Sequence, residues 1–296
     1  MIKPLNIVSV WTHQLEKGEQ PNGDELIDHL TAIHDNNAGF TETVAWNCRD
    51  LMGKNSYELL ADIIDTDNHS KALDLACGSG VLLDLCNRRF GNKISLVGVD
   101  MNNAELQLAR KRLIDTNIKL HYGIAQDLSF IDDSSVDVIL CHWALSLMDP
   151  VEPVLKNIKR ILRKNGSFGA IIEGDFKTAP TYLEINNIIY KHVRKEYPNY
   201  GVIELGDMSM KTFDALKENA SKIFDNVSVD VTPFILSFSA SAEILAREVA
   251  GFFYASFVLS ENGYNKMLLE LEKYFSENFK SGLSSFEMPV KRVVIN

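Results

Sequence analysis

Short apolar runs, separated by longer amphipathic segments, predict the buried strands of this chain. They lie at 71–76, 95–99, 136–141 and 167–172, and their side chains are nearly all apolar. Such runs are typical of parallel strands that are buried on both faces of a sheet. The segment 119–125 is predicted to form a further strand.

The rest of the chain mostly shows apolar residues at helical spacing. Residues 1–70 are predicted to be mainly helical, with clear patterns at 25–33 and 56–64. Asp149 is predicted to cap a helix that begins at Pro150 and ends at Asn165 and Gly166. Later helices are predicted at 182–193, 208–224, 241–257 and 264–279, and strands at 227–236 and 288–295.

The first apolar run passes into a helical pattern through Cys77-Gly78-Ser79-Gly80. Glycines at such a junction permit a positive φ, and they let a ligand approach the backbone. The following helix directs unpaired N–H groups and the positive end of its dipole to the same place. The pattern indicates a nucleotide-like site, although a tight turn without a ligand would also explain it.

The second run ends in Asp100, about 20 residues after Gly78. In dinucleotide-binding folds, an acidic residue at this spacing accepts hydrogen bonds from ribose hydroxyls. A dinucleotide fingerprint would require a third glycine where Leu83 stands, and no Walker loop is present. Asp100 is therefore predicted to bind a ribose that does not belong to a dinucleotide.

The run Leu-Asp-Leu-Ala-Cys-Gly-Ser-Gly at 73–80 resembles the first motif of the class I S-adenosylmethionine-dependent methyltransferases. The resemblance continues in order through 97–101, 130–137 and 158–166, and it covers about residues 70–175. It implies a Rossmann-like, doubly wound α/β fold with a mostly parallel seven-stranded sheet and an added helical cap. It also implies S-adenosyl-L-methionine as the cofactor, with S-adenosyl-L-homocysteine as the product.

The same resemblance implies where the cofactor binds. Gly78 and Gly80 would admit its methionyl part, Asp74 would orient its amino group, and Asp100 would bind the ribose diol. Relatives commonly have Asp where this chain has Ile124, so Gln126 or Asp127 would accept the hydrogen bond from the adenine amine instead. The backbone of Ala125 would donate to the adenine ring. The complete predicted set is Asp74, Ala76, Gly78, Gly80, Asp100, Met101, Ala125, Gln126 and His142.

The acceptor is predicted to bind beyond the carboxyl end of the strand at 136–141, because ligands of open parallel sheets bind at that edge. His142 and Trp143 follow this strand directly, and His142 is also a candidate general base. By analogy with the family, Phe40, Trp46 and Tyr57 are candidates for a lid, although aromatic residues at helical spacing more often belong to a core. Glu173 and Asp175 follow the next strand and are candidates for steering the acceptor.

Composition narrows the choice of partners. The chain has 40 acidic and 30 basic residues, and its net charge of −10 disfavours nucleic acid. The basic cluster Arg110, Lys111 and Arg112 is predicted to be a solvated helix face. The 4 cysteines show no Cys-x-x-Cys pair, so reduced thiols and no metal site are expected in a cytoplasmic protein. The longest apolar run, 249–259, is too short to span a membrane, and no signal peptide is recognised.

Together, these observations favour a methyltransferase that acts on a small molecule. A protein or nucleic-acid methyltransferase, a nicotinamide-dependent oxidoreductase and a non-catalytic cofactor-binding module remain alternatives. The predicted segments are a helical lid (1–70), a cofactor-binding core (71–175), a helical insertion that shapes the acceptor pocket (176–225) and C-terminal elements that complete the sheet and cap (226–296). The oligomeric state and the methylated atom stay open.

Overall fold

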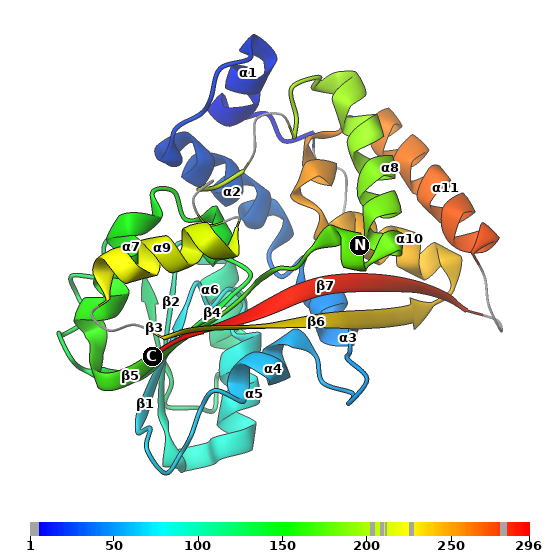
Figure 1. The fold of residues 1–296 in the computed structure, drawn as a ribbon. Coiled ribbons are helices and arrows are strands. Elements are labelled where there is room, and N and C mark those ends of the chain that lie inside the picture. Colours follow the sequence, from blue (N-terminus) through cyan, green and yellow to red (C-terminus); the bar gives the residue numbers. More distant parts are fainter. Residues whose placement is uncertain (1–5, 202–204, 208–209, 211, 225–227, 279–282) are drawn as a thin grey trace. The chain divides into compact units, whose positions relative to one another are not determined.

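The fold was analysed in a computed structural model that describes residues 1–296 except 1–5, 202–204, 208–209, 211, 225–227 and 279–282 (Figure 1). The described chain divides into two compact units. The sheet unit comprises Ser56–Glu173, Gly206–Phe234 and Val290–Asn296, and the helical unit comprises Met1–Asn55, Gly174–Leu205 and Ile235–Pro289. Residues 56–70, which were predicted to belong to the lid, therefore lie in the sheet unit.

The described strands form a seven-stranded sheet in the order β3-β2-β1-β4-β5-β7-β6. Neighbours among β1 to β5 pair in parallel, and β7 pairs antiparallel with β5. This confirms the predicted Rossmann-like, mostly parallel fold. The strands are β1 (Lys71–Leu75), β2 (Ser95–Asp100), β3 (Lys119–Tyr122), β4 (Val136–His142), β5 (Leu162–Glu173), β6 (Val229–Ala240) and β7 (Ser284–Ile295).

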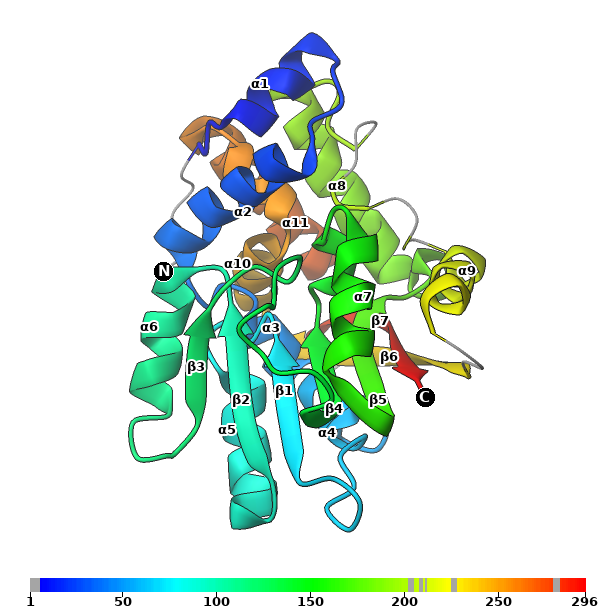
Figure 2. The same ribbon diagram turned by 90° about the vertical axis from the view of Figure 1, so that its left-hand side faces the viewer.

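Helices cover both faces of the sheet in the sheet unit (Figure 2). One face is covered by α4 (Ser56–Ala61), α5 (Val81–Phe90) and α6 (Asn103–Arg112), and the other by α7 (Val151–Ile161) and α9 (Phe213–Ile223) (Figure 1). The core contains fully buried side chains such as Leu73 and Ile139, each of which contributes about 1.5–3 kcal/mol through burial. The short helices η1 (Gly91–Lys93) and η2 (Leu145–Leu147) also belong to this unit.

The helical unit contains an aromatic cluster in which Phe40 packs edge-on against Phe257, beside Ile7 and Ile33. Phe40 is thus a core residue of this unit. Within the described ranges, no helix combines the length and apolar character that a membrane crossing requires. The unit's helices are α1 (Val10–Lys17), α2 (Gly23–Asn37), α3 (Glu42–Asn47), η3 (Phe176–Thr178), α8 (Pro180–Glu196), α10 (Ala242–Phe252), η5 (Tyr254–Val258) and α11 (Glu261–Glu277).

The predicted limits of α7 are wrong at both ends. The helix begins at Val151 with Pro150 as its N-cap, and no side chain caps it, so Asp149 is not the capping residue. Instead, the carboxylate of Asp207 accepts a hydrogen bond from the Val151 N–H at 2.9 Å. The helix ends at Ile161, and β5 begins at once, with Asn165 inside the strand at a φ of 68°. A partner more than fifty residues away thus replaces the local cap that the sequence suggested.

Candidate functional site

The loop between β1 and α5 contains three residues in the left-handed region, namely Ala76, Gly78 and Gly80, with φ of 59°, 50° and 79°. Glycine adopts this conformation without a steric penalty, whereas an L-residue such as alanine pays about 1–2 kcal/mol. The loop is closed by hydrogen bonds from Cys77 N–H to the Val99 carbonyl and from Gly80 N–H to the Cys77 carbonyl, each 2.9 Å long. Packing around the loop therefore holds Ala76 in a strained conformation.

The two glycines have different surroundings. A Cβ on Gly80 would lie 3.1 Å from the Cβ of Ala109, so Gly80 faces α6 and lets this helix approach the loop. A Cβ on Gly78 would lie 3.7 Å from the Glu105 carboxylate, which leaves ordinary space. Gly78 is therefore the glycine whose surroundings leave room beside the backbone.

Asp100 at the carboxyl end of β2 orients the loop. Its carboxylate accepts a hydrogen bond from Gly78 N–H at 2.7 Å and another from Asn102 N–H at 2.8 Å, one on each oxygen. These bonds fix the orientation of the buried Asp100 carboxylate at the carboxyl end of β2, directly beside the glycine loop.

Asp74 on the neighbouring strand β1 is only 3% exposed. Neither of its carboxyl oxygens has a hydrogen-bond partner among the described residues. Burial, together with the nearby charge of Asp100, raises the pKa of Asp74 to about 8. A buried carboxylate without partners is costly, and an incoming cation or hydrogen-bond donor would favour its ionised form. The site therefore fits a ligand that brings a positive group to Asp74, beside the buried carboxylate of Asp100.

The segment after β3 contains the residues predicted to contact adenine. The side-chain amide of Asn157 on α7 donates hydrogen bonds to the carbonyls of Ala125 at 3.1 Å and Gln126 at 3.0 Å. These two bonds fix the backbone of this segment. Met101 precedes β3 in the sequence and Ile124 follows it. Both side chains are half-buried. Asn157 did not appear among the predicted residues, because its position on an amphipathic helix gave no sign of a contact with this loop.

His142 ends β4 and packs against the start of α4. Its Nε2 lies 2.9 Å from the Ser56 hydroxyl, and its ring stacks on Tyr57 with ring centroids 3.9 Å apart. Burial lowers the pKa of His142 to about 3, so the ring is neutral at physiological pH. Tyr57, a candidate for the lid, is buried in this stack, and its contact with an acceptor stays a prediction. The predicted general-base role of His142 also stays a prediction, and the low pKa argues against it.

Residues 72–166 match a family model described as a methyltransferase domain. The match begins in β1, runs through the loop at Gly78 and Asp100, and includes β4. This segment matches a methyltransferase family, and we refer to it as the methyltransferase domain. The match agrees with the sequence motifs at Gly78 and Asp100.

Similar curated proteins cover the same part of the chain. A demethylmenaquinone methyltransferase of Lactobacillus johnsonii is 32% identical over 133 residues, which are 44% of this chain and 52% of that protein. A demethylmenaquinone methyltransferase of Staphylococcus epidermidis is 29% identical over 125 residues, which are 42% of this chain and 51% of that protein. The chain thus spans about half the length of the curated relatives it matches.

Solved structures share the fold over most of the chain. The YcgJ protein from Bacillus subtilis has a TM-score of 0.51 at 16% identity, with 81% of this chain and 96% of that chain covered. The MccD protein has a TM-score of 0.52 at 15% identity, with coverages of 83% and 98%. At these identities, the similarity supports the fold over the aligned part of the chain and nothing beyond the fold.

The basic cluster of α6 is only partly solvated, which corrects the prediction for Arg112. Its guanidinium donates to the Ser79 carbonyl at 2.5 Å and to the Ser79 hydroxyl at 2.9 Å, so it braces the loop of the methyltransferase domain. Arg110 and Lys111 are exposed as predicted. Sequence periodicity does not identify the role of Arg112, because the contact joins residues 33 positions apart.

The residues predicted to bind the acceptor lie in different units. Trp143 belongs to the methyltransferase domain, has a φ of 57°, and lies edge-on to His142 with ring centroids 6.5 Å apart. Trp46 belongs to the helical unit, where the Arg49 guanidinium lies 6.0 Å from the centroid of its ring. Trp46 and the cap therefore stay predictions. Glu173 at the end of β5 accepts a hydrogen bond from the Ser146 hydroxyl at 3.0 Å.

Proposed function

We propose that this chain transfers the methyl group of S-adenosylmethionine to a small-molecule acceptor. The observation that carries the proposal is a pair of buried carboxyl groups on adjacent strands. Asp74 has no hydrogen-bond partner among the described residues, and Asp100 is held against the glycine loop by the Gly78 N–H. The cofactor has an ammonium group at one end and a ribose diol in its middle. Its chemistry thus complements both carboxyl groups.

Within this proposal, Asp74 would hold the amino group, and Asp100 would accept hydrogen bonds from the ribose diol. The backbone of Ala76 and Gly78 would lie along the methionyl part, with Gly80 supporting α6. Met101, Ala125 and Gln126 would surround the adenine ring. The hydrogen bonds from Asn157 support this placement, because they hold the Ala125–Gln126 backbone in one conformation before any ligand arrives.

The bound cofactor would supply a methyl group activated by its sulfonium centre, which an acceptor nucleophile displaces in line. The protein's task is then to orient the acceptor and exclude water. Tyr57 and His142 offer a stacked aromatic surface at the end of β4. Since its pKa is about 3, His142 stays neutral and does not repel a sulfonium.

The acceptor belongs to the small-molecule class in this proposal. The curated relatives are demethylmenaquinone methyltransferases, so quinol-type ring compounds are the first acceptors to test. Glu173 ends β5, the strand that pairs with β4, so it lies at the same edge of the sheet as His142. Its carboxylate accepts a hydrogen bond from the Ser146 hydroxyl, and this favours an acceptor that carries a hydroxyl group. It would receive a hydrogen bond from the acceptor's hydroxyl group.

Calorimetric titration with S-adenosylhomocysteine tests the cofactor, with NADH as the competing ligand. We expect micromolar binding of the former alone. An Asp115→Ala variant, which removes an exposed carboxylate distant in sequence from the loop, serves as a control and should bind equally well. Binding of NADH alone would favour an oxidoreductase, and no binding of either would refute the proposal.

Transfer of a labelled methyl group to quinol and phenol acceptors tests the reaction. Trp143→Ala should lower the turnover of an accepted substrate more than it lowers the affinity for S-adenosylhomocysteine. Equal losses would place Trp143 in the cofactor site or the core. Binding of S-adenosylhomocysteine without turnover of any small acceptor would favour a macromolecular acceptor or a non-catalytic module.

A further inference from the structure

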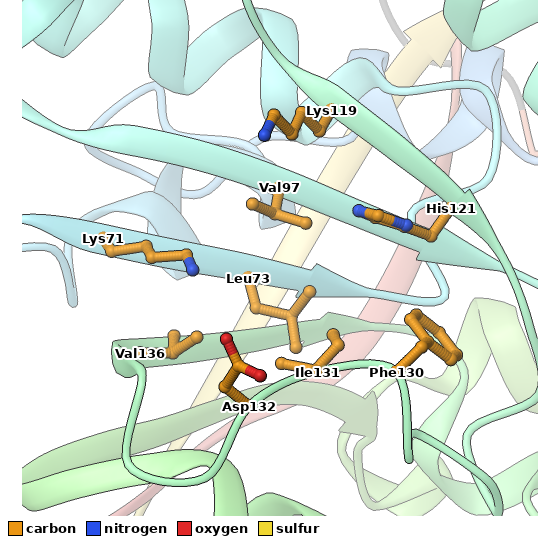
Figure 3. A pocket seen from close by; sticks show the side chains of 9 residues that line it. All are labelled: Lys71, Leu73, Val97, Lys119, His121, Phe130, Ile131, Asp132 and Val136. Atoms are coloured by element: carbon orange, nitrogen blue, oxygen red, sulfur yellow. The ribbon is translucent and has the colours of Figure 1, made fainter.

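A pocket opens on the sheet of the sheet unit (Figure 3). Lys71, Lys119 and Val136 of its lining are the first residues of β1, β3 and β4, at the opposite ends of the strands from Asp100 and His142. The pocket has a volume of about 220 Å³. Val97 of β2 contributes to its floor. The next residue, Gly98, faces Leu83 of α5, and alternation along a strand directs Val97 to the opposite face. The pocket therefore lies on the face that α5 does not cover.

The floor of the pocket is apolar and belongs to the regular part of the sheet. Leu73, Val97 and Lys119 are register partners on the adjacent strands β1, β2 and β3. The connection between β3 and β4 has no helix, and Ile131 in this connection lines the pocket together with the buried Val136. An ordinary strand–helix–strand unit would fill this space with a helix, whereas here it stays open.

Three charged side chains surround this apolar floor (Figure 3). Among the residues that the structure describes, the ammonium groups of Lys71 and Lys119 make no hydrogen bond or ion pair, and neither does the carboxylate of Asp132. Two positive charges and one negative charge give the lining a net charge of +1. This arrangement suits a ligand with a single negative group, because Asp132 would repel a second one.

An aromatic pair forms one end of the pocket. The rings of His121 and Phe130 lie with centroids 5.5 Å apart. A Cβ on Gly123 would lie 2.8 Å from the Phe130 ring, so this ring packs directly on the backbone there. Phe130 is nevertheless 45% exposed and presents its remaining surface to the pocket. A flat ring would gain contact with these two aromatic groups and with the aliphatic floor.

We propose that this pocket binds a small aromatic monocarboxylate. Its carboxylate lies between the ammonium groups of Lys71 and Lys119, and its ring lies on the half-buried Val97 against the exposed face of Phe130. The volume is below the roughly 300–1,000 Å³ that drug-sized ligands occupy, so the ligand has one or two rings. The site is separate from methyl transfer and does not depend on that proposed function.

Paired titrations with 2-naphthoate and neutral 2-naphthalenemethanol test the charge requirement. The protein is titrated both alone and saturated with S-adenosylhomocysteine, followed by calorimetry or by the fluorescence of the naphthalene ring. We expect naphthoate to bind at least tenfold more tightly than the alcohol, with the same affinity in both states. Competition with S-adenosylhomocysteine would overturn the proposal, since it would place the probe in the methyl-transfer site.

Variants then locate the probe. Lys71→Met combined with Lys119→Met should weaken naphthoate at least tenfold and leave the alcohol unchanged. Lys111→Met removes an exposed lysine on α6 and should change neither affinity. Both lysine side chains project from the sheet surface without partners, so the double variant should fold, which its unfolding transition verifies. Equal naphthoate affinity in the wild type and the double variant, or no binding up to several millimolar, would refute the site.

Discussion

A carboxyl group lies near each end of the parallel strands, and the two groups differ in their hydrogen bonds and in the direction in which their pKa is shifted. At the carboxyl end of β1, Asp74 is buried without a hydrogen bond from any described residue, and its pKa rises to about 8 because of burial and the charge of Asp100. At the amino end of β4, Asp137 accepts hydrogen bonds from both Ser70 and Arg163. Burial alone would raise the pKa of Asp137, but these bonds and one from Lys71 N–H lower it to about 2.

This difference indicates that the amino end of the sheet contributes to stability, whereas the carboxyl end is suited to binding a ligand. The amino end joins β1, β4 and β5 through a carboxylate that accepts hydrogen bonds from Ser70, Lys71 and Arg163, which is typical of a structural network. The carboxyl end retains a strained loop, an unpaired carboxyl group and a histidine with a strongly lowered pKa. Such unfavourable groups persist where a ligand compensates them. Variants at both ends can test this division.

Removal of the Asp137 carboxylate should have the largest effect. Asp137→Ala leaves Arg163, Ser70 and the Lys71 N–H without their acceptor and should lower the free energy of unfolding by about 3 kcal/mol. Denaturant titration measures this loss, and Asp115→Ala should stay within about 0.5 kcal/mol of the wild type. S-adenosylhomocysteine affinity should be unchanged in the folded protein. A loss of affinity without a loss of stability would contradict the division between the two ends.

The contribution of Asp137 should also depend on pH. Its pKa in the folded state, about 2, lies below the ordinary value of 3.8, so the carboxylate stabilises the fold fully above pH 4. This stabilisation is lost as the pH falls from about 4 towards 2. The difference in unfolding free energy between wild type and Asp137→Ala should therefore shrink in this range. A difference that stays constant from pH 6 to pH 3 would show that the fold does not lower the pKa of Asp137.

Asp100→Ala should have the next largest effect. It should lower the affinity for the cofactor and not the stability of the fold. It removes charge-assisted hydrogen bonds worth about 1.5–3 kcal/mol, so S-adenosylhomocysteine should bind at least tenfold more weakly. It also removes the acceptor of the Gly78 N–H. Asp100→Asn keeps one acceptor oxygen and should lose less affinity. Unchanged affinity in the alanine variant would show that the ribose is bound elsewhere.

Asp74 should make cofactor binding dependent on pH. With a pKa of about 8, it is mostly protonated in the free protein at pH 7, and a bound ammonium group would favour its ionised form. Binding should then release nearly one proton at pH 7, and affinity should rise from pH 6 to pH 8 by about tenfold per pH unit at most. Calorimetry in two buffers of different ionisation enthalpy measures the released protons. Asp74→Asn should abolish both effects, and their persistence would assign them to another group.

The sequence was a good guide to local features of the sheet. Mostly apolar runs predicted β1, β2 and β4 closely, and the spacing from Gly78 located Asp100 at the end of β2. Contacts between distant segments were not accessible in this way. The stack of Tyr57 on His142, the hold of Asn157 on Ala125 and the brace from Arg112 each join residues that are remote in the sequence. Neither periodicity nor spacing determines which remote side chains meet. For the same reason, the sequence could not predict that Asp74 has no hydrogen-bond partner among the described residues.

Ala76→Gly should have the smallest effect. It tests whether the loop at the carboxyl end of β1 is strained. Ala76 has a φ of 59°, which costs about 1–2 kcal/mol for an L-residue, whereas glycine adopts it freely. Glycine also gains about 0.5–1 kcal/mol of entropy in the unfolded chain, so the net stabilisation should be about 0.5 kcal/mol. Ala104→Gly inside α6 is the matched control and should destabilise the protein, because its helical φ favours alanine. If both substitutions destabilise equally, Ala76 is not strained, and its side chain is required by packing.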